Sequence, residues 1–265
     1  MKPVILIKLG GSCITDKTTP YTARQNTIER LAREIGEASQ QRETSLIIGN
    51  GAGSFGHVPA KEYCLLKGGT DEKSLKGVTL THNAAARLNL LVVSALIQAN
   101  AKAISVAPAS CFLGKEGRVT GFFSGPFFSF LDLGLVPVVF GDVVSDASSG
   151  YSILSTDTLL SFLAKELKEK KYRVEKVIHV GITDGVLDEN GKTIPIVSSK
   201  NYSQIQHAIG KASTIDVTGG MAYKVRQAME LARAGIETWI VNGEKEGELV
   251  RAVRGENVRG TIIKK

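Results

Sequence analysis

Short apolar blocks alternate with longer amphipathic stretches along most of this chain. Blocks rich in Val, Ile and Leu have the length and composition of buried strands, and apolar positions that recur every three or four residues between them predict helices. The predicted strands lie near residues 4–9, 45–49, 103–107, 136–140, 176–180 and 237–242. The predicted helices lie near residues 25–40, 55–66, 78–100, 156–170, 222–234 and 246–254. This alternation predicts an α/β fold with a mostly parallel central sheet covered by helices on both faces.

Two stretches interrupt the alternation. Residues 111–123 and 143–154 hold glycine and serine turns between short apolar runs, which predicts two antiparallel ribbons. The 265 residues are enough to bury a large core, and we find no repeat or long linker. We therefore expect residues 1–265 to form a single two-lobed unit that divides near residue 155.

Two of the predicted strands run into glycine turns. The first reads Lys8-Leu9-Gly10-Gly11-Ser12, and the second reads Gly49-Asn50-Gly51-Ala52-Gly53-Ser54-Phe55-Gly56-His57. Backbone N–H groups at such turns point at anions, and glycine allows a close approach that a Cβ would block. Because the carboxyl ends of parallel strands meet at one edge of a sheet, the pattern predicts that two phosphate groups are held near each other.

The second turn matches two familiar nucleotide motifs only in part. Gly51 to Gly56 fits G-x-G-x-x-G, but the polar stretch 67–73 stands where a dinucleotide-binding fold needs a strand ending in an acidic residue. A Walker A loop is excluded because His57 and Val58 stand where its Lys and Ser/Thr belong. A dinucleotide-binding oxidoreductase stays open as the alternative from a different class.

Three lysines lie beside these and other glycine turns. Lys8 shares a strand face with Val4 and Leu6, and a lysine in that setting needs an anionic partner. Lys17 and Lys224 each follow a glycine turn, and taken alone each reads as an ordinary surface lysine.

Composition narrows the class of protein. The net charge of +7 fits a lysine-rich surface, and aromatic residues at 6% with no RNA-binding or zinc-finger motif argue against a nucleic-acid partner. We read the three cysteines as free thiols, because they are odd in number and widely spaced. We find neither a membrane-spanning run nor a signal peptide, so we expect a cytoplasmic enzyme.

Taken together, several segments resemble the amino-acid kinase superfamily and, within it, the isopentenyl phosphate kinase family. The segments that carry the resemblance are the two glycine turns with Asp16-Lys17, then 141–144, 153–157, 183–186 and Asp216-Val217-Thr218-Gly219-Gly220-Met221-Ala222-Tyr223-Lys224. The histidine that ends the second glycine turn is typical of members whose acceptor is itself a phosphate or phosphonate. The resemblance implies the three-layer α/β/α sandwich of the carbamate kinase-like fold, with residues 1–155 as the phosphate-acceptor lobe and 156–265 as the ATP-binding lobe.

The resemblance also implies a reaction, in which ATP phosphorylates isopentenyl phosphate to isopentenyl diphosphate. Five residues are implied in catalysis: Lys8, Lys17, His57, Asp157 and Lys224. Besides its lysines, the implied nucleotide site contains Gly10, Gly11, Ser12, Asp184, Gly185, Gly219 and Gly220. The implied acceptor site contains Gly51, Ala52, Gly53, Gly56 and His57, with an apolar tail pocket of Val78, Thr81, His82, Ala85, Val143 and Ile153. No protein cage for a metal is expected, since ATP phosphates and water would carry Mg²⁺.

Other kinases of the superfamily remain alternatives. A fosfomycin-type kinase would share the loop histidine, whereas acetylglutamate and glutamate kinases need a cationic clamp for carboxylates that this sequence does not obviously supply. The small or polar Thr81 and Ala85 suggest a pocket open to longer alkyl phosphates. The resemblance also implies a homodimer, for which apolar helix positions such as Leu88, Leu91, Val92 and Leu96 are candidates.

Overall fold

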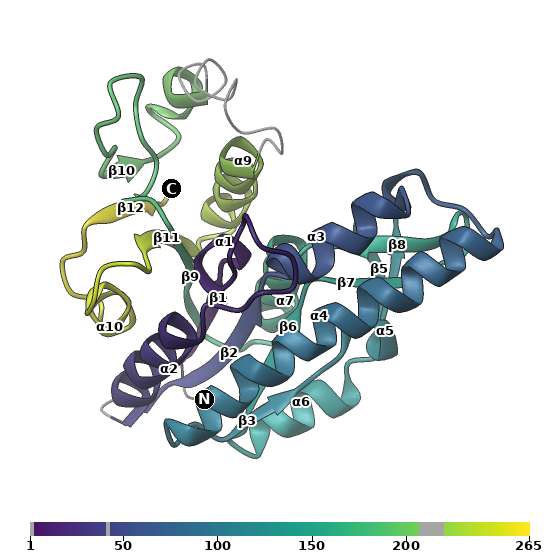
Figure 1. Cartoon of the computed structure of the whole chain (residues 1–265). Coiled ribbons are helices and arrows are strands. Elements are labelled where there is room, and N and C mark those ends of the chain that lie inside the picture. Colours follow the sequence, from purple (N-terminus) through teal and green to yellow (C-terminus); the bar gives the residue numbers. More distant parts are fainter. Residues whose placement is uncertain (1–2, 41–42, 207–219) are drawn as a thin grey trace.

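The central sheet is predominantly parallel, as predicted. The computed structural model describes residues 3–40, 43–206 and 220–265, and in this part of the chain eight strands follow the order β10-β12-β11-β9-β1-β2-β6-β3 (Figure 1). They are β1 (Val4–Leu9), β2 (Ser45–Asn50), β3 (Ala103–Ser105), β6 (Val136–Phe140), β9 (Val174–Gly181), β10 (Ile196–Val197), β11 (Glu237–Asn242) and β12 (Gly260–Ile263). All neighbouring pairs are parallel except β11 with β12.

Helices cover both faces of this sheet and complete the three layers. One face packs against α2 (Gln25–Gln40), α4 (Glu72–Gln98) and α10 (Glu248–Arg254), and the other packs against α6 (Gly125–Asp132), α7 (Thr156–Glu169) and α9 (Gly220–Arg233). Strand β1 shows how the sequence makes two cores. Ile5, Ile7 and Leu9 enter the first core, whereas Val4 and Leu6 enter the second. Lys8 therefore points towards the α7 face.

A smaller sheet carries the two predicted ribbons. Strands β4 (Phe112–Lys115) and β5 (Arg118–Phe122) pair antiparallel, as do β7 (Asp142–Asp146) and β8 (Gly150–Leu154). A single parallel contact between β4 and β7 joins the two ribbons into the order β5-β4-β7-β8. The ribbons lie beside α3 (Gly53–Glu62), α4 and α5 (Pro108–Cys111) in Figure 1.

Several predicted boundaries were wrong. Helix α3 ends at Glu62 rather than near 66, because Cys64 adopts a left-handed conformation with φ 54°, and a short 3₁₀ turn follows over Leu65–Lys67. Helix α4 begins at Glu72 rather than near 78, because the Asp71 side chain accepts from the Ser74 backbone N–H. The sequence interpretation also missed α6, β10 and β12.

Helix α4 needs a separate comment, because by length and hydropathy alone it would be able to cross a membrane. Half of that apolar window is buried inside the fold, where α4 contacts α2, α3 and β6. The structure also corrects the surface assigned to this helix. Leu88, Val92 and Leu96 are core residues, and of the four candidates for a dimer contact only Leu91 is exposed.

Candidate active site

The two glycine turns meet backbone to backbone where β1 and β2 end. These strands pair in parallel, with Lys8 opposite Gly49. A Cβ on Gly11 would lie 2.5 Å from the Gly53 nitrogen, and one on Gly51 would lie 2.6 Å from the Gly11 nitrogen. Gly53 has φ 49°, which strains other residues. Glycine is therefore required here for the turns to touch.

Thr15 joins the two turns, a role that the sequence interpretation missed. Its hydroxyl donates to the Gly11 carbonyl at 2.7 Å and accepts from the Ser54 N–H at 3.1 Å. This hydroxyl stands just after α1 (Gly11–Ile14) and reaches the first turn of α3. The bridge fixes the helix that carries His57 relative to the strand that carries Lys8.

The start of α7 brings Asp157 to the same place. The Ser155 side chain caps this helix by accepting from the Thr158 N–H, and the Thr156 hydroxyl donates to the Asn50 carbonyl at 2.8 Å. The first turn of α7 is thus tied to the end of β2. Here the Asp157 Oδ2 accepts a hydrogen bond from the Lys8 Nζ, and their side chains are only 16% and 12% exposed.

Two further groups face the Asp157 carboxylate. His179 Nδ1, on β9, lies 3.1 Å from Asp157 Oδ1, and Lys224 on α9 adds positive charge. Burial by itself would raise the pKa of Asp157, but the Lys8 ammonium, His179 and Lys224 outweigh it and hold the pKa well below its usual range. The carboxylate is therefore ionised, it contacts Lys8 and lies beside His179, and the charge of Lys224 reaches it from α9.

His57 lies on α3, close enough to Lys8 to feel its charge. Partial removal from water, together with the positive charge of Lys8, lowers the pKa of His57 below its ordinary value. The residue is nevertheless exposed overall. An imidazole that is neutral near pH 7, and whose protonation a bound anion would favour, therefore lies within range of the Lys8 charge.

The other residues expected around the phosphates lie at helix starts, in an exposed loop, or outside the described part of the chain. Ser12 lies in α1, Ala52 and Gly56 belong to the second glycine turn and α3, and Gly220 begins α9. Lys17 is exposed in the loop after α1, where the Asp16 carboxylate accepts from the Thr18 N–H at 2.7 Å. Gly219 falls outside the described residues.

Asp184 and Gly185 lie in the turn after β9. The Asp184 carboxylate accepts from Lys245 and, at 2.8 Å, from Asn242, and these bonds lower its pKa. Gly185 has φ 90°, and a Cβ there would lie 2.3 Å from the Thr261 hydroxyl. The turn that we expected to border the nucleotide is therefore a rigid structure tied to β11 and β12.

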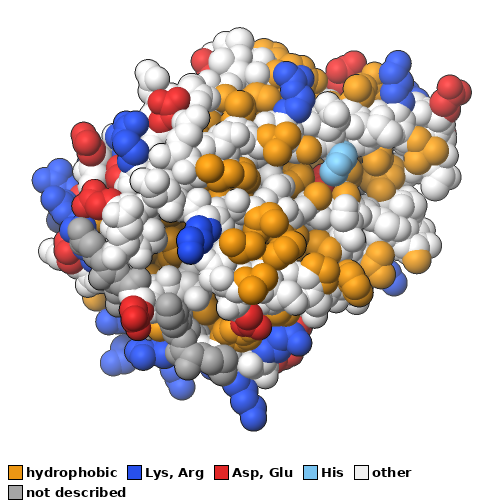
Figure 2. All heavy atoms as spheres, turned by 90° about the horizontal axis from the view of Figure 1, so that it is seen from below, with side chains coloured by type: hydrophobic (Ala, Val, Ile, Leu, Met, Phe, Trp, Pro, Cys, Tyr) orange, Lys and Arg blue, Asp and Glu red, His pale blue; other side chains and the backbone are white. Residues whose placement is uncertain are grey.

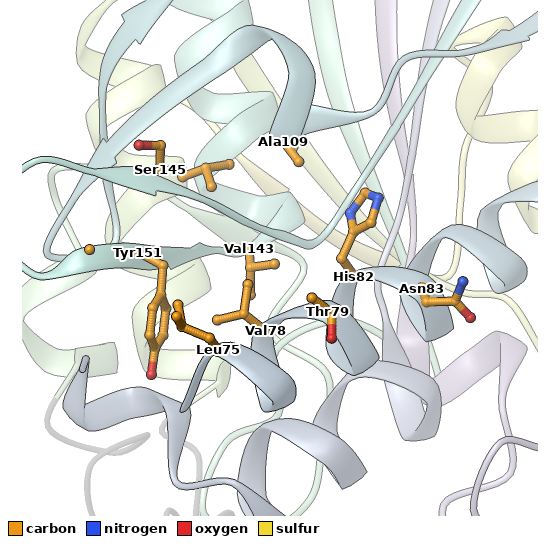
Figure 3. Close-up of a pocket in the computed structure, with 11 residues that line it drawn as sticks. Leu75, Val78, Thr79, His82, Asn83, Ala109, Val143, Ser145 and Tyr151 are labelled. Atoms are coloured by element: carbon orange, nitrogen blue, oxygen red, sulfur yellow. The ribbon is translucent and has the colours of Figure 1, made fainter. Parts of the chain in front are cut away.

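The tail-pocket residues do not all share one space. A cavity of about 390 Å³ lies between α4 and β7, and Figure 3 shows His82 and Val78 of α4 beside Val143 of β7. Val78 and Val143 also pack with Ile153 in a small apolar cluster. No described residue of α3 lines the cavity. Thr81 and Ala85 are buried in α4, and they and Ile153 do not line it.

His82 is held in the cavity wall by a buried carboxylate. Its Nδ1 lies 2.9 Å from Asp142 Oδ1, and Asp142 also accepts from the backbone N–H groups of Ala109 and Val143. Burial raises the pKa of Asp142, although His82 opposes this. The pair joins α4 to β7 and fixes the orientation of the imidazole.

The site as a whole is suited to anions. It combines contacting glycine turns with two lysines around one ionised aspartate and with a nearby histidine. Groups of these kinds bind phosphate and stabilise the charge that develops during phosphoryl transfer. In the described part of the chain, no group of three or more His, Cys, Asp or Glu side chains is placed to hold a metal ion.

Comparisons with known proteins agree with this chemistry. The model of the amino acid kinase family matches residues 3–242. The chain is 38% identical to an isopentenyl phosphate kinase of Methanothermobacter thermautotrophicus, with 98% of each chain covered, and 33% identical to one of Methanocaldococcus jannaschii, with 97% of each covered. A solved structure of an isopentenyl phosphate kinase superposes with a TM-score of 0.82 at 33% identity, covering 98% of this chain and 100% of that chain.

Proposed function

The chain belongs to the amino acid kinase family, and we propose that it transfers the γ-phosphoryl group of ATP to isopentenyl phosphate, giving ADP and isopentenyl diphosphate. The observation that carries this proposal is the placement of His57 in the helix that starts where the two glycine turns meet, within range of the Lys8 charge. A phosphate acceptor needs no general base, and a carboxylate at that position would repel it. A histidine donor at that position therefore favours an acceptor that already carries a phosphate.

Catalysis by this site rests on positioning and charge. In phosphoryl transfer the protein does little covalent chemistry, and cations hold the oxygens that gain charge. We assign that task to Lys8 and Lys224, with Lys17 adding charge near the γ-phosphate, and Asp157 holds Lys8 in place. The N–H groups of Gly11 and Gly53 are assigned to the phosphate oxygens, whereas those of Gly10 and Gly51 donate to the carbonyls of Val180 and Leu9 at 2.8 Å and only line the turns.

The nucleotide is assigned to the second lobe, 156–265, and the acceptor to the first, 1–155. Asp184, Gly185 and Gly220 would border the nucleotide, and Gly219 belongs to the same motif. Glycine lets the two turns contact each other closely, which brings their backbones to one place at the ends of β1 and β2. Mg²⁺ would be carried by those phosphates and by water, and it would neutralise part of their charge.

The acceptor tail is assigned to the apolar cluster between α3, α4 and the ribbons. Val143 is buried there among Leu65 and Tyr151, and Ala60 of α3 also packs against it. Ala60 follows His57 by one helical turn, so a tail bound through its phosphate at His57 would extend over Ala60. Acceptance of tails longer than five carbons stays a hypothesis about this cluster.

We also assign the protein to the cytoplasm and to a homodimer. Five large apolar residues of α4 are exposed: Leu75, Leu80, Leu90, Leu91 and Ile97. Figure 2, which views the molecule from below, shows a broad group of hydrophobic side chains across that face. An apolar surface of this kind is typical of a contact between subunits.

The experiment that tests the proposal measures ADP release with Mg²⁺-ATP and a panel of acceptors. The panel contains isopentenyl, dimethylallyl and geranyl phosphates, fosfomycin, N-acetylglutamate and glutamate. We expect turnover of the five-carbon phosphates, abolished in a Lys8→Ala variant. Turnover of fosfomycin alone would keep the role of His57 and replace the acceptor, whereas turnover of a carboxylate alone would contradict the proposal.

A further inference from the structure

His179 sits at the centre of the proposed catalytic site, although its sequence context gives it no role. It lies on β9, directly opposite Lys8 of β1 in the parallel register. It is 5% exposed, and Val177, two residues earlier on the same strand, packs in the core on the α7 face. The imidazole is therefore buried beneath the start of α7, next to Lys8.

The two oxygens of Asp157 are used differently. Oδ2 accepts from Lys8, whereas Oδ1 is buried and has no regular hydrogen bond with any described group. His179 Nδ1 is likewise buried without a regular partner, and these two atoms lie 3.1 Å apart. Since buried polar atoms are nearly always paired, each is the available partner of the other.

We propose that His179 is a positioning residue, whose Nδ1–H holds the free oxygen of Asp157 and thereby fixes the direction in which Asp157 presents Lys8. The inference rests on the proposed function, because Lys8 and Asp157 take part in catalysis only if the protein transfers a phosphoryl group. A carboxylate held at both oxygens has one orientation, whereas one held at a single oxygen turns about its Cβ–Cγ bond. Lys8 would follow that rotation.

The protonation states agree with this role. Burial lowers the pKa of His179, as do the charges of Lys224 and Lys8, while Asp157 opposes the shift. The imidazole is therefore neutral at pH 7 and carries one hydrogen. Facing an ionised carboxylate, that hydrogen belongs on Nδ1. The other ionisable groups facing the pair come from β1 and α9, namely Lys8 and Lys224.

The first test compares three variants by steady-state kinetics. His179→Leu removes the donor, His179→Asn places an amide nitrogen near the position of Nδ1, and Thr238→Val is the matched control. Thr238 is fully buried on the neighbouring strand β11, and its hydroxyl makes no hydrogen bond with any described group. All three variants exchange a buried polar side chain in the same sheet.

We expect His179→Leu to lower kcat by about 10- to 100-fold, by analogy with the loss of a hydrogen bond that orients a metal ligand. The KM values for ATP and isopentenyl phosphate should stay within about threefold, because ground-state contacts remain. His179→Asn should recover most of kcat, and Thr238→Val should match the parent. The inference is wrong if His179→Leu keeps the parental kcat, or if Leu and Asn variants lose activity equally at unchanged melting temperature.

A second test does not depend on activity. The chain has four histidines, so long-range ¹H–¹⁵N spectra of ¹⁵N-histidine protein are simple, and the His179→Asn variant assigns the His179 signals by their absence. We expect His179 of the parent protein to be the Nδ1–H tautomer. The ¹⁵N signals of His179 should shift in the Asp157→Asn variant. The Nε2–H tautomer would overturn the inference even in an active enzyme. Silence of the parent on every acceptor, with the Nδ1–H tautomer present, would instead refute the proposed function and leave the contact standing.

Discussion

Replacement of Asp157 by Asn is the most direct test of the proposed site. The substitution keeps the shape of the side chain and one acceptor oxygen, and it removes the negative charge that Lys8, His179 and Lys224 surround. Lys8 then loses its charged partner while both residues remain largely buried. The Asp157→Asn variant keeps Lys8 but no longer holds it in position.

The size of the effect follows from this geometry. Misplacing a catalytic group by about 1 Å costs roughly 100-fold in rate, or about 2.7 kcal/mol in the barrier. We expect a loss of kcat of that order. The KM for ATP should not rise, because the variant removes a negative charge that repels the triphosphate. Loss of kcat with an equal or lower KM for ATP is therefore the expected pattern.

Stability responds to the same charge, and its dependence on pH has a definite sign. The pKa of Asp157 in the folded protein lies well below that of the unfolded chain, so its contribution is present above about pH 4 and is lost as the pH falls. Breaking a buried ion pair costs about 3–5 kcal/mol, and the remaining amide acceptor places Asp157→Asn at the low end. Urea unfolding at several pH values should show a parent–variant difference that is constant near neutrality and shrinks in acid.

Kinetics and unfolding together can refute the reasoning. An unchanged kcat with reduced stability would make Asp157 a structural residue and remove it from the catalytic site. A raised KM for ATP with unchanged kcat would place the carboxylate in nucleotide binding instead. A difference in stability that grows in acid would contradict the lowered pKa.

Three further outcomes are expected. His57→Ala should lower kcat/KM for isopentenyl phosphate by roughly 10- to 100-fold, which corresponds to the loss of a charge-assisted hydrogen bond, while the KM for ATP is unchanged. A bound dianion favours protonated His57, so the kcat/KM of the parent should fall as the pH rises above the His57 pKa. His57→Ala should lose this pH dependence. Chelation of divalent cations with EDTA should stop ADP release, and excess Mg²⁺ should restore it, whereas activity that persists in EDTA would exclude the assigned role of the metal. Leu91→Glu should halve the molar mass measured by light scattering, whereas the control Leu66→Glu, at a more exposed position outside α4, should not; an unchanged mass in both would move the contact elsewhere.

The alternation of apolar residues was enough to predict the layers. Strand β1 alternates between the two cores as its sequence indicates, and helix α2 occupies the predicted residues 25–40. Local signals also explain some errors. The Asp71 cap before α4 and the proline that opens α6 were both readable in the sequence, and both were passed over.

The site was predictable to the extent that its residues sit in motifs. Lys8, His57 and Asp157 each stand beside a turn or a helix start with its own sequence signature. The structure places Lys8 in contact with Asp157, and it places His57 on α3 within range of the Lys8 charge. Thr15 has no such signature. Its hydroxyl matters only because the two glycine turns touch, and that contact depends on the packing of β1 beside β2.

The role of His179 could not be predicted from the alternation of apolar residues along β9. Alternation along β9 assigns it to the face of Val177, but it does not say which residue of β1 lies opposite. A shift of the register by two residues would keep every apolar side chain in its core and would move the imidazole about 7 Å along the strand, away from Asp157. The structure pairs His179 with Lys8, and α7 packs against both β1 and β9, so the pairing is seen only in the assembled fold. The register between β9 and β1 is therefore what places this buried histidine, which has apolar neighbours in the sequence, next to Lys8 and Asp157.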